Sequence, residues 1–377
     1  MTEWNGVRLA DLELRSARLL LRPWQAADVT AVTEIMRDPR MAEFLPLPRP
    51  YTAEHAAELL QATTGNGPAA GRWEWAIVRD TRLVGAIGMT LPSGDRGAEI
   101  GYWVRGADWG SGYATEAVRT LCRFAFEHGV RRVTIQTDIG NVPSARVALR
   151  AGFSFEGIAR LGTRSQRGPS DHAVFARLAT DSDAQIPPAW PELTELTDGV
   201  LLMRKVCPDD WPTLYAEGSN PESLRWGFGG EYTEQAAIQR AETAGLNWLI
   251  GRSADLVICD VATGAGAGAM NLRWVGPPDV IGLGYGILPE FRGRRFTTRA
   301  LRLLADWAFS QTSIVRLELG CKVANVASAR SAELAGFVRD GRFACRLRDP
   351  DGGYSDELSF ALVRDQRRQR PPDQPQQ

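Results

Sequence analysis

Apolar and polar positions follow a small set of patterns that recur along the chain. Residues 98–104 and 131–138 alternate with a period of two, which predicts strands. Between them, residues 114–125 place apolar side chains at helical spacing and predict an amphipathic helix. A second helix is predicted after Asn141, ending near Gly152. Strands mixed with helices and hairpins indicate an α/β or α+β domain built on a mixed sheet.

The same succession of patterns occurs twice. NVPSARVALRAGF begins at Asn141 and NVASARSAELAGF begins at Asn325, and other matched pairs, such as Gly112 with Arg295, lie at nearly the same offset. A repeat this long predicts a duplicated domain rather than a solenoid.

Four segments follow from this repeat. We predict an N-terminal domain over residues 1–180 and a C-terminal domain over residues 199–365. Prolines between them, at residues 181–198, indicate a linker of limited flexibility. The last segment, 366–377, lacks apolar residues and is expected to be disordered.

Composition excludes several classes of function. A net charge of -1 over 377 residues gives no sign of a nucleic-acid partner. The five cysteines are scattered and odd in number, which indicates a reducing compartment, and the three histidines lie too far apart to suggest a metal site. No apolar run approaches 18 residues and no signal peptide is evident, so we expect a cytoplasmic protein without a membrane partner.

A short stretch, WGSGYATEA at residues 109–117, stands between a predicted strand and a predicted helix. Backbone N–H groups at a helix N-terminus bind anions, and glycine lets a phosphate approach the backbone because it has no Cβ. The glycines alone are equally consistent with a tight turn. The amides proposed for a phosphate cradle are those of Gly110, Ser111, Gly112, Tyr113, Ala114 and Thr115.

In order and spacing, these motifs resemble the GNAT superfamily of acetyl-CoA-dependent N-acyltransferases, and most closely its RimJ/RimL-like branch. The resemblance rests on AEIGYWV, WGSGYATEA, RRVTIQTD and NVPSARVALRAGF, and covers roughly residues 17–178. It implies two tandem GNAT-like domains of α/β (α+β) class, each a mixed, mostly antiparallel sheet flanked by helices. It also implies acetyl-CoA as co-substrate and no metal. The family's pyrophosphate motif corresponds here to Trp109-x-x-Gly112-x-Ala114, in which the first position departs from the usual Gln or Arg.

The second copy departs further from that motif. It reads Arg292-x-x-Arg295-x-Thr297, so both small positions are filled. We predict that the cofactor site there is lost or weakened. Two alternatives are open: the loop still turns and Arg295 points into solvent, or the Arg295 guanidinium pairs with a phosphate from outside.

The proposed chemistry is removal of a proton from an amine that attacks a thioester, because an alkylamine is mostly protonated at neutral pH. Glu99 is the candidate base, and a surface glutamate paired with arginine is the alternative. The second copy has Gly282 at the matched position, which also argues that this copy is degenerate. Ser144 is the candidate hydrogen-bond donor to the departing thiolate, with a helix-capping role as its alternative.

The resemblance assigns further residues to the pantetheine arm of the cofactor. Asn141 resembles the family's asparagine at this place, and Trp103 and Val104 are implied to offer backbone groups.

We therefore expect an N-acetyltransferase whose N-terminal domain transfers acetyl to a primary amine, either a protein N-terminus or a small molecule. The alternatives are a non-catalytic acyl-CoA-binding or regulatory module and a tandem enzyme with two active domains. For the oligomeric state, the sequence is consistent with a monomer whose two domains pair like the subunits of a dimer and with a homodimer.

Overall fold

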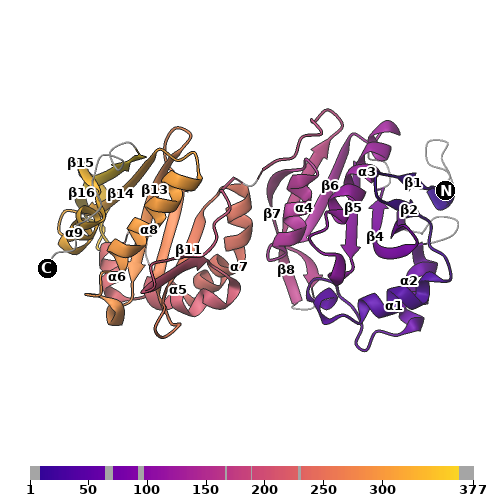
Figure 1. The fold of residues 1–377 in the computed structure, drawn as a ribbon, viewed down its shortest axis with the longest axis horizontal. Helices are drawn as coiled ribbons and strands as arrows, with labels where there is room; N and C mark the ends of the chain where they lie inside the picture. The colour runs from indigo at the N-terminus through magenta and orange to yellow at the C-terminus, as the bar shows by residue number, and fades with distance from the viewer. Residues whose placement is uncertain are drawn as a thin grey trace. The chain divides into compact units, whose positions relative to one another are not determined.

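The computed structural model describes residues 9–63, 71–91, 97–165, 168–187, 189–227 and 231–364. The chain divides into two compact units, residues 1–187 and residues 188–377, and each contains one copy of the repeat (Figure 1). The tail predicted to be disordered lies outside the described residues.

The N-terminal unit is a single eight-stranded sheet flanked by helices. The strand order is β1-β2-β3-β4-β5-β6-β8-β7, and among the strands that the structure describes here only β5 and β6 run parallel. This is the predicted mixed, mostly antiparallel sheet. The strands are β1 (Leu14–Arg15), β2 (Leu20–Arg22), β3 (Arg72–Arg79), β4 (Arg82–Thr90), β5 (Gly97–Val104), β6 (Arg132–Asp138), β7 (Ser154–Ser165) and β8 (Gly168–Leu178).

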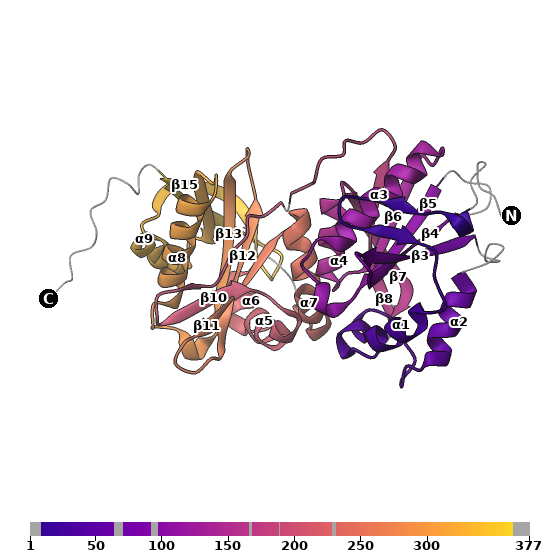
Figure 2. The same ribbon diagram turned by 45° about the vertical axis from the view of Figure 1, so that its right-hand side comes forward.

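Two pairs of helices cover this sheet, one on each face (Figures 1 and 2). Helices α1 (Asp28–Met36) and α2 (Ala53–Thr63) enclose a core cluster that includes Val32, Ala76, Val78 and Ala86. Helices α3 (Tyr113–Glu127) and α4 (Val142–Arg150) lie on the other side, and the apolar stripe predicted for residues 114–125 is the buried side of α3.

The C-terminal unit repeats this architecture with a second eight-stranded sheet, ordered β15-β16-β14-β13-β12-β11-β10-β9. Again one pair is parallel, β13 with β14. Its strands are β9 (Leu196–Thr197), β10 (Leu201–Lys205), β11 (Ala254–Asp260), β12 (Gly266–Trp274), β13 (Val280–Ile287), β14 (Arg316–Lys322), β15 (Val338–Arg348) and β16 (Tyr354–Val363). Its helices are α5 (Trp211–Gly218), α6 (Pro221–Trp226), α7 (Glu234–Ile250), α8 (Phe296–Gln311) and α9 (Val326–Ala335). The tandem duplication read from the sequence is therefore confirmed.

Candidate active site

The two parallel strands of the N-terminal sheet separate in the middle of the unit. β5 and β6 pair only from Gly97 to Glu99, opposite Arg132 to Thr134. Beyond that point β5 continues to Val104 with β4 as its only strand partner among the described residues. Backbone N–H and C=O groups left unpaired on a strand edge readily bind another extended chain. The gap therefore suits an extended ligand that carries amide groups.

Glu99 lies at the point where the strands part. Its side chain is exposed and accepts a hydrogen bond from Nε2 of Gln136 at 3.1 Å. Within the described ranges, Glu99 thus pairs with a neutral amide and with no arginine. Gly101 and Trp103 follow on the same face of β5, and Trp103 stacks on Trp24 with ring centroids 6.4 Å apart.

The loop after β5 bends through two left-handed glycines. Gly110 has φ 78° and Gly112 has φ 81°, a conformation in which a Cβ is strained. Helix α3 starts at Tyr113 with no side chain capping its N-terminus. The amides of residues 112–115 are thus available at the positive end of a helix of 15 residues. The indole of Trp109 fixes the loop by donating to the carbonyl of Val104 at 2.7 Å.

The equivalent loop of the second copy keeps this backbone shape despite its arginines. Gly293 has φ 74° and Arg295 has φ 60°. Arg292 donates through Nε to the carbonyl of Ile287 at 3.1 Å, which is the bond that Trp109 makes in the first copy. The turn has been retained, so the difference between the two loops lies in their side chains.

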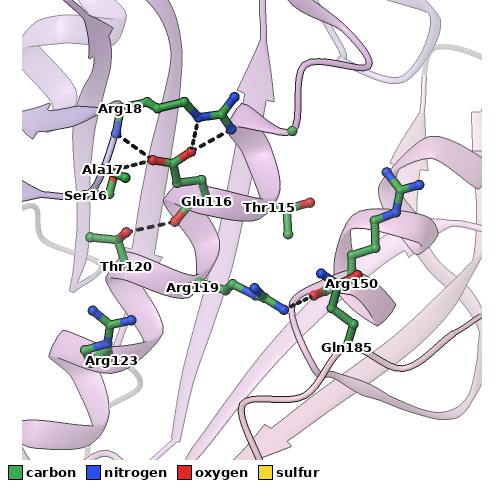
Figure 3. Close-up of a pocket in the computed structure, with 11 residues that line it drawn as sticks. Ser16, Ala17, Arg18, Thr115, Glu116, Arg119, Thr120, Arg123, Arg150 and Gln185 are labelled. Carbon is green, nitrogen blue, oxygen red and sulfur yellow. Dashed lines mark hydrogen bonds and ion pairs between the residues drawn. The ribbon is translucent and has the colours of Figure 1, made fainter.

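A basic pocket of about 520 Å³ opens beside the first loop (Figure 3). Arg119, Arg123 and Arg150 line it and form no ion pair with any carboxylate in the described parts of the chain. Arg18 is instead held by Glu116, and it also donates to the carbonyl of Ser111 at 3.1 Å. Four arginines and one glutamate make the pocket attractive to anions. Its other lining residues are Ser16, Ala17, Gly112, Thr115, Thr120 and Gln185.

The repeat does not keep the pocket arginines at the matching positions, although the second loop itself carries Arg292, Arg294 and Arg295. The positions that match Arg18, Arg123 and Arg150 are Val200, Asp306 and Leu334. The second copy therefore lacks three of the four arginines of this pocket.

On the opposite face of β5, a hydroxyl pair joins the strand to helix α4. The hydroxyls of Tyr102 and Ser144 are 2.9 Å apart. Burial raises the pKa of Tyr102 despite the hydrogen bond with Ser144, so the phenol stays protonated. Asn141 caps the helix by accepting from the Ser144 amide at 3.1 Å. The sequence did not indicate a role for Tyr102, because a tyrosine was expected only on the helix after Asn141. The period of two in AEIGYWV does place Tyr102 on the face of the strand opposite to Glu99.

The second copy retains this pair but not the carboxylate. The hydroxyls of Tyr285 and Ser328 are 3.0 Å apart, and burial raises the pKa of Tyr285 to about 12. At Gly282, which matches Glu99, an added Cβ would lie 2.6 Å from Cγ1 of Val275. A glutamate would not fit there without displacing that side chain.

A metal site and a membrane-spanning helix were searched for among the described residues. Among them, no group of histidine, cysteine and carboxylate side chains has the geometry to bind a metal ion. No described helix combines the length and apolar character that crossing a membrane requires. All five cysteines are free.

Comparisons with known proteins agree with this architecture. The acetyltransferase (GNAT) domain family matches residues 18–154 and again residues 201–338. An uncharacterised N-acetyltransferase of Bacillus subtilis (strain 168), YoaA, is 28% identical over 167 residues, which are 43% of this chain and 94% of that protein. The ribosomal-protein-serine acetyltransferase of Escherichia coli (strain K12) is 30% identical over 104 residues, 27% of this chain and 58% of that protein.

Among solved structures, Mycobacterium smegmatis RimJ in complex with CoA-disulfide is 21% identical to this chain. The match covers 46% of this chain and 90% of the RimJ chain, with a TM-score of 0.41. The family match covers most of the chain and falls once in each unit. The protein is a GNAT-family acetyltransferase that contains the family's domain twice.

Proposed function

We propose that the N-terminal domain is an acetyl-CoA-dependent N-acetyltransferase acting on a primary amine, and that the C-terminal domain is a degenerate copy. The observation that carries this proposal is the contrast between the two loops. The first combines uncapped helix amides with a pocket of unpaired arginines, and the second has lost most of those arginines. Diphosphate and a ribose phosphate, the anionic groups of coenzyme A, match the first arrangement in charge.

Residues of the first domain fit this co-substrate at three places. The amides of residues 112–115 would hold the diphosphate, and the pocket lined by Arg119, Arg123 and Arg150 would hold the nucleotide end. The gap between β5 and β6 would take the amide-bearing pantetheine arm. The co-substrate supplies an acetyl group activated as a thioester.

The chain's own groups act at two atoms, the acceptor nitrogen and the departing sulfur; the nitrogen releases its second proton to water as the amide forms, and coenzyme A leaves as the thiolate. Glu99 receives the proton of the acceptor's ammonium, directly or through water, which frees the nitrogen lone pair to attack. The Ser144 hydroxyl, polarised by Tyr102, donates a hydrogen bond toward the departing sulfur. Glu99 and this hydroxyl pair lie on opposite faces of β5, so the amine and the sulfur can be served from opposite sides of the strand.

A pair of reciprocal variants tests the assignment in the full-length protein. Gly112→Arg puts a Cβ at φ 81° and a long side chain over the amides, and Arg295→Gly is its matched control. We expect calorimetric titration of acetyl-CoA to give close to one site per chain in the wild type. Gly112→Arg should weaken that site at least about tenfold, which corresponds to roughly 1.4 kcal/mol.

The control variant Arg295→Gly distinguishes one active domain from two. Arg295→Gly should leave both the affinity and the site number unchanged. Two equivalent sites in the wild type, or loss of binding only when residue 295 is altered, would contradict the assignment. A thiol-release assay over an amine panel, with Glu99→Gln as the inactive reference, reports turnover independently.

A further inference from the structure

One polar side chain reaches Glu99 across the gap between β5 and β6. Gln136 of β6 donates through Nε2 to Oε2 of Glu99 at 3.1 Å. The last residue of β6 that pairs with β5 is Thr134, opposite Glu99, so Gln136 is the next residue on the same face beyond the point of separation. The hydrogen bond therefore spans the start of the gap.

This bond occupies one oxygen of the carboxylate and leaves the other. An ionised carboxylate only accepts hydrogen bonds, so the amide of Gln136 must turn its Nε2 toward Glu99. Oε1 of Glu99 has no hydrogen-bond or ion-pair partner in the described parts of the chain. Glu99 thus retains one oxygen that can receive a proton while the other is held.

The space beside this pair is open to an acceptor. Gly101 follows Glu99 on the same face, and it would be opposite Gln136 if the two strands stayed paired. Gly101 is exposed, and a Cβ built on it would meet no heavy atom of the described residues within 4 Å. An amine can therefore approach Glu99 over Gly101, beside the amide of Gln136.

Gln136 extends from a backbone that is fixed on its other side. β6 continues to pair with β8 beyond the point of separation, and Gln136 is opposite Val174 there. Glu99 is exposed, and an exposed glutamate side chain without a partner samples several rotamers. A hydrogen bond from the paired strand restricts the carboxylate before the acceptor arrives, which reduces the entropy that is lost on reaching the reactive geometry.

The second copy has lost both members of this pair. Gly282 matches Glu99, and Gly320 of β14 matches Gln136. A Cβ on Gly320 would collide with the carboxylate of Glu357, so another side chain occupies that place. Loss of the glutamine together with the glutamate is expected if the amide serves the carboxylate rather than the fold.

We propose that Gln136 is a positioning residue of the N-terminal domain, which fixes the Glu99 carboxylate through Oε2 and leaves Oε1 to take the proton of the acceptor's ammonium. The inference rests on the proposed function, because it takes Glu99 as the base. The proton passes from the ammonium nitrogen to Oε1 of Glu99, and the amide neither gains nor loses a proton. Substitution of Gln136 should therefore act on kcat, and only while Glu99 is present.

The test is a double-mutant cycle in the full-length protein, measured as thiol release over a panel of primary amines. Gln136→Met keeps the length and unbranched shape of the side chain but removes its N–H donor. It should lower kcat about tenfold, less than the roughly 10²–10⁴-fold that a general base supplies, and should leave the KM for acetyl-CoA unchanged. In a Glu99→Gln background the same substitution should have no further effect, because residues that act through one another are not additive.

Glu156→Gln is the matched control. Glu156 of β7 binds another side chain of β6, that of Arg132, at 2.7 Å, and its replacement should leave both kcat and KM unchanged. A wild-type kcat in Gln136→Met, or losses that add in the double variant, would overturn the inference and leave the proposed function in place. Because Gln136 is exposed, its replacement should also leave the Tm unchanged, and a marked fall would assign the amide to the fold instead.

Crystal structures separate this inference from the proposed function. The Glu99 carboxylate should have a single position against Gln136 in the wild type, and should be displaced or spread over several positions in Gln136→Met. If no amine is acetylated, that displacement sustains the positioning of Glu99 and rejects the proposed function. A carboxylate at the same position in both structures overturns the inference, whatever the turnover.

Discussion

A single hydroxyl illustrates how one residue is set up by its surroundings. Tyr102 projects from β5 toward the first turn of α4. There the Asn141 side chain accepts a hydrogen bond from the Ser144 amide, and the Tyr102 and Ser144 hydroxyls are hydrogen-bonded to each other. Burial keeps the phenol protonated well above neutral pH. The pair is thus fixed as a donor rather than as a base.

We predict that Tyr102→Phe lowers kcat by about tenfold, less than the roughly 10²–10³-fold loss of a direct donor, because Tyr102 acts through the Ser144 hydroxyl. The fall should be the same across the neutral and mildly alkaline range, because the phenol does not titrate there. Steady-state rates of thiol release between pH 6 and about 9 check this, with Tyr285→Phe as the control expected to keep full activity. An alkaline limb that disappears in Tyr102→Phe would contradict the assigned role.

At the scale of elements, the start of the sheet is tied to helix α3 by charge. Glu116 accepts from the Ser16 hydroxyl at 2.7 Å, from the Arg18 amide at 2.9 Å and from the Arg18 guanidinium at 2.7 Å. In the second copy the charges are exchanged: Asp198 lies before β10 and Arg299 lies on α8, 2.5 Å apart. The link between these elements has been retained while its polarity has been reversed.

Glu116→Gln should lower the free energy of unfolding of the N-terminal unit by about 2 kcal/mol at pH 7. Partial burial acts to raise the pKa of Glu116, but the bonds from Ser16 and Arg18 outweigh it and hold the pKa below its usual value. A depressed pKa stabilises the fold above the unfolded value and loses that effect as pH falls through the folded value. Urea titrations should therefore show the difference between variant and wild type shrinking as the pH falls below the ordinary glutamate value of about 4.3. A difference independent of pH would contradict this.

At the scale of the whole molecule, two units with separate cores should unfold as two transitions. Each contains a bidentate ion pair at the matching place: Arg22 with Asp28, at 2.8 and 2.9 Å, and Arg204 with Asp210, at 2.7 and 2.8 Å. The aspartate of each pair is buried, so replacing it should destabilise its own unit.

We expect Asp28→Asn to lower one calorimetric transition and Asp210→Asn the other, each by about 2–3 kcal/mol of unfolding free energy. Acetyl-CoA at about a hundred times its Kd should then stabilise only the transition sensitive to residue 28, by roughly 2.7 kcal/mol. Stabilisation of the transition sensitive to residue 210 would place the binding site in the other unit.

Much of this architecture was available from the sequence because it depends on local pattern. The strand alternation through Glu99, the left-handed glycines of WGSGYATEA and the duplication all have short-range signatures. The pairing of the Tyr102 and Ser144 hydroxyls had none, since it joins strand β5 to helix α4, which are distant in the chain. The arginine pocket likewise gathers side chains from the N-terminal segment, α3 and α4, whose proximity only tertiary packing provides.

The left-handed backbone at Arg295 has a consequence for the stability of the C-terminal unit. A non-glycine residue in that conformation carries a strain of about 1 kcal/mol that glycine would not. The turn itself therefore still suits the smaller residue, which the first copy has at the matching position, Gly112. Restoring that residue should relax the loop, so that Arg295→Gly makes the C-terminal unit slightly more heat-resistant.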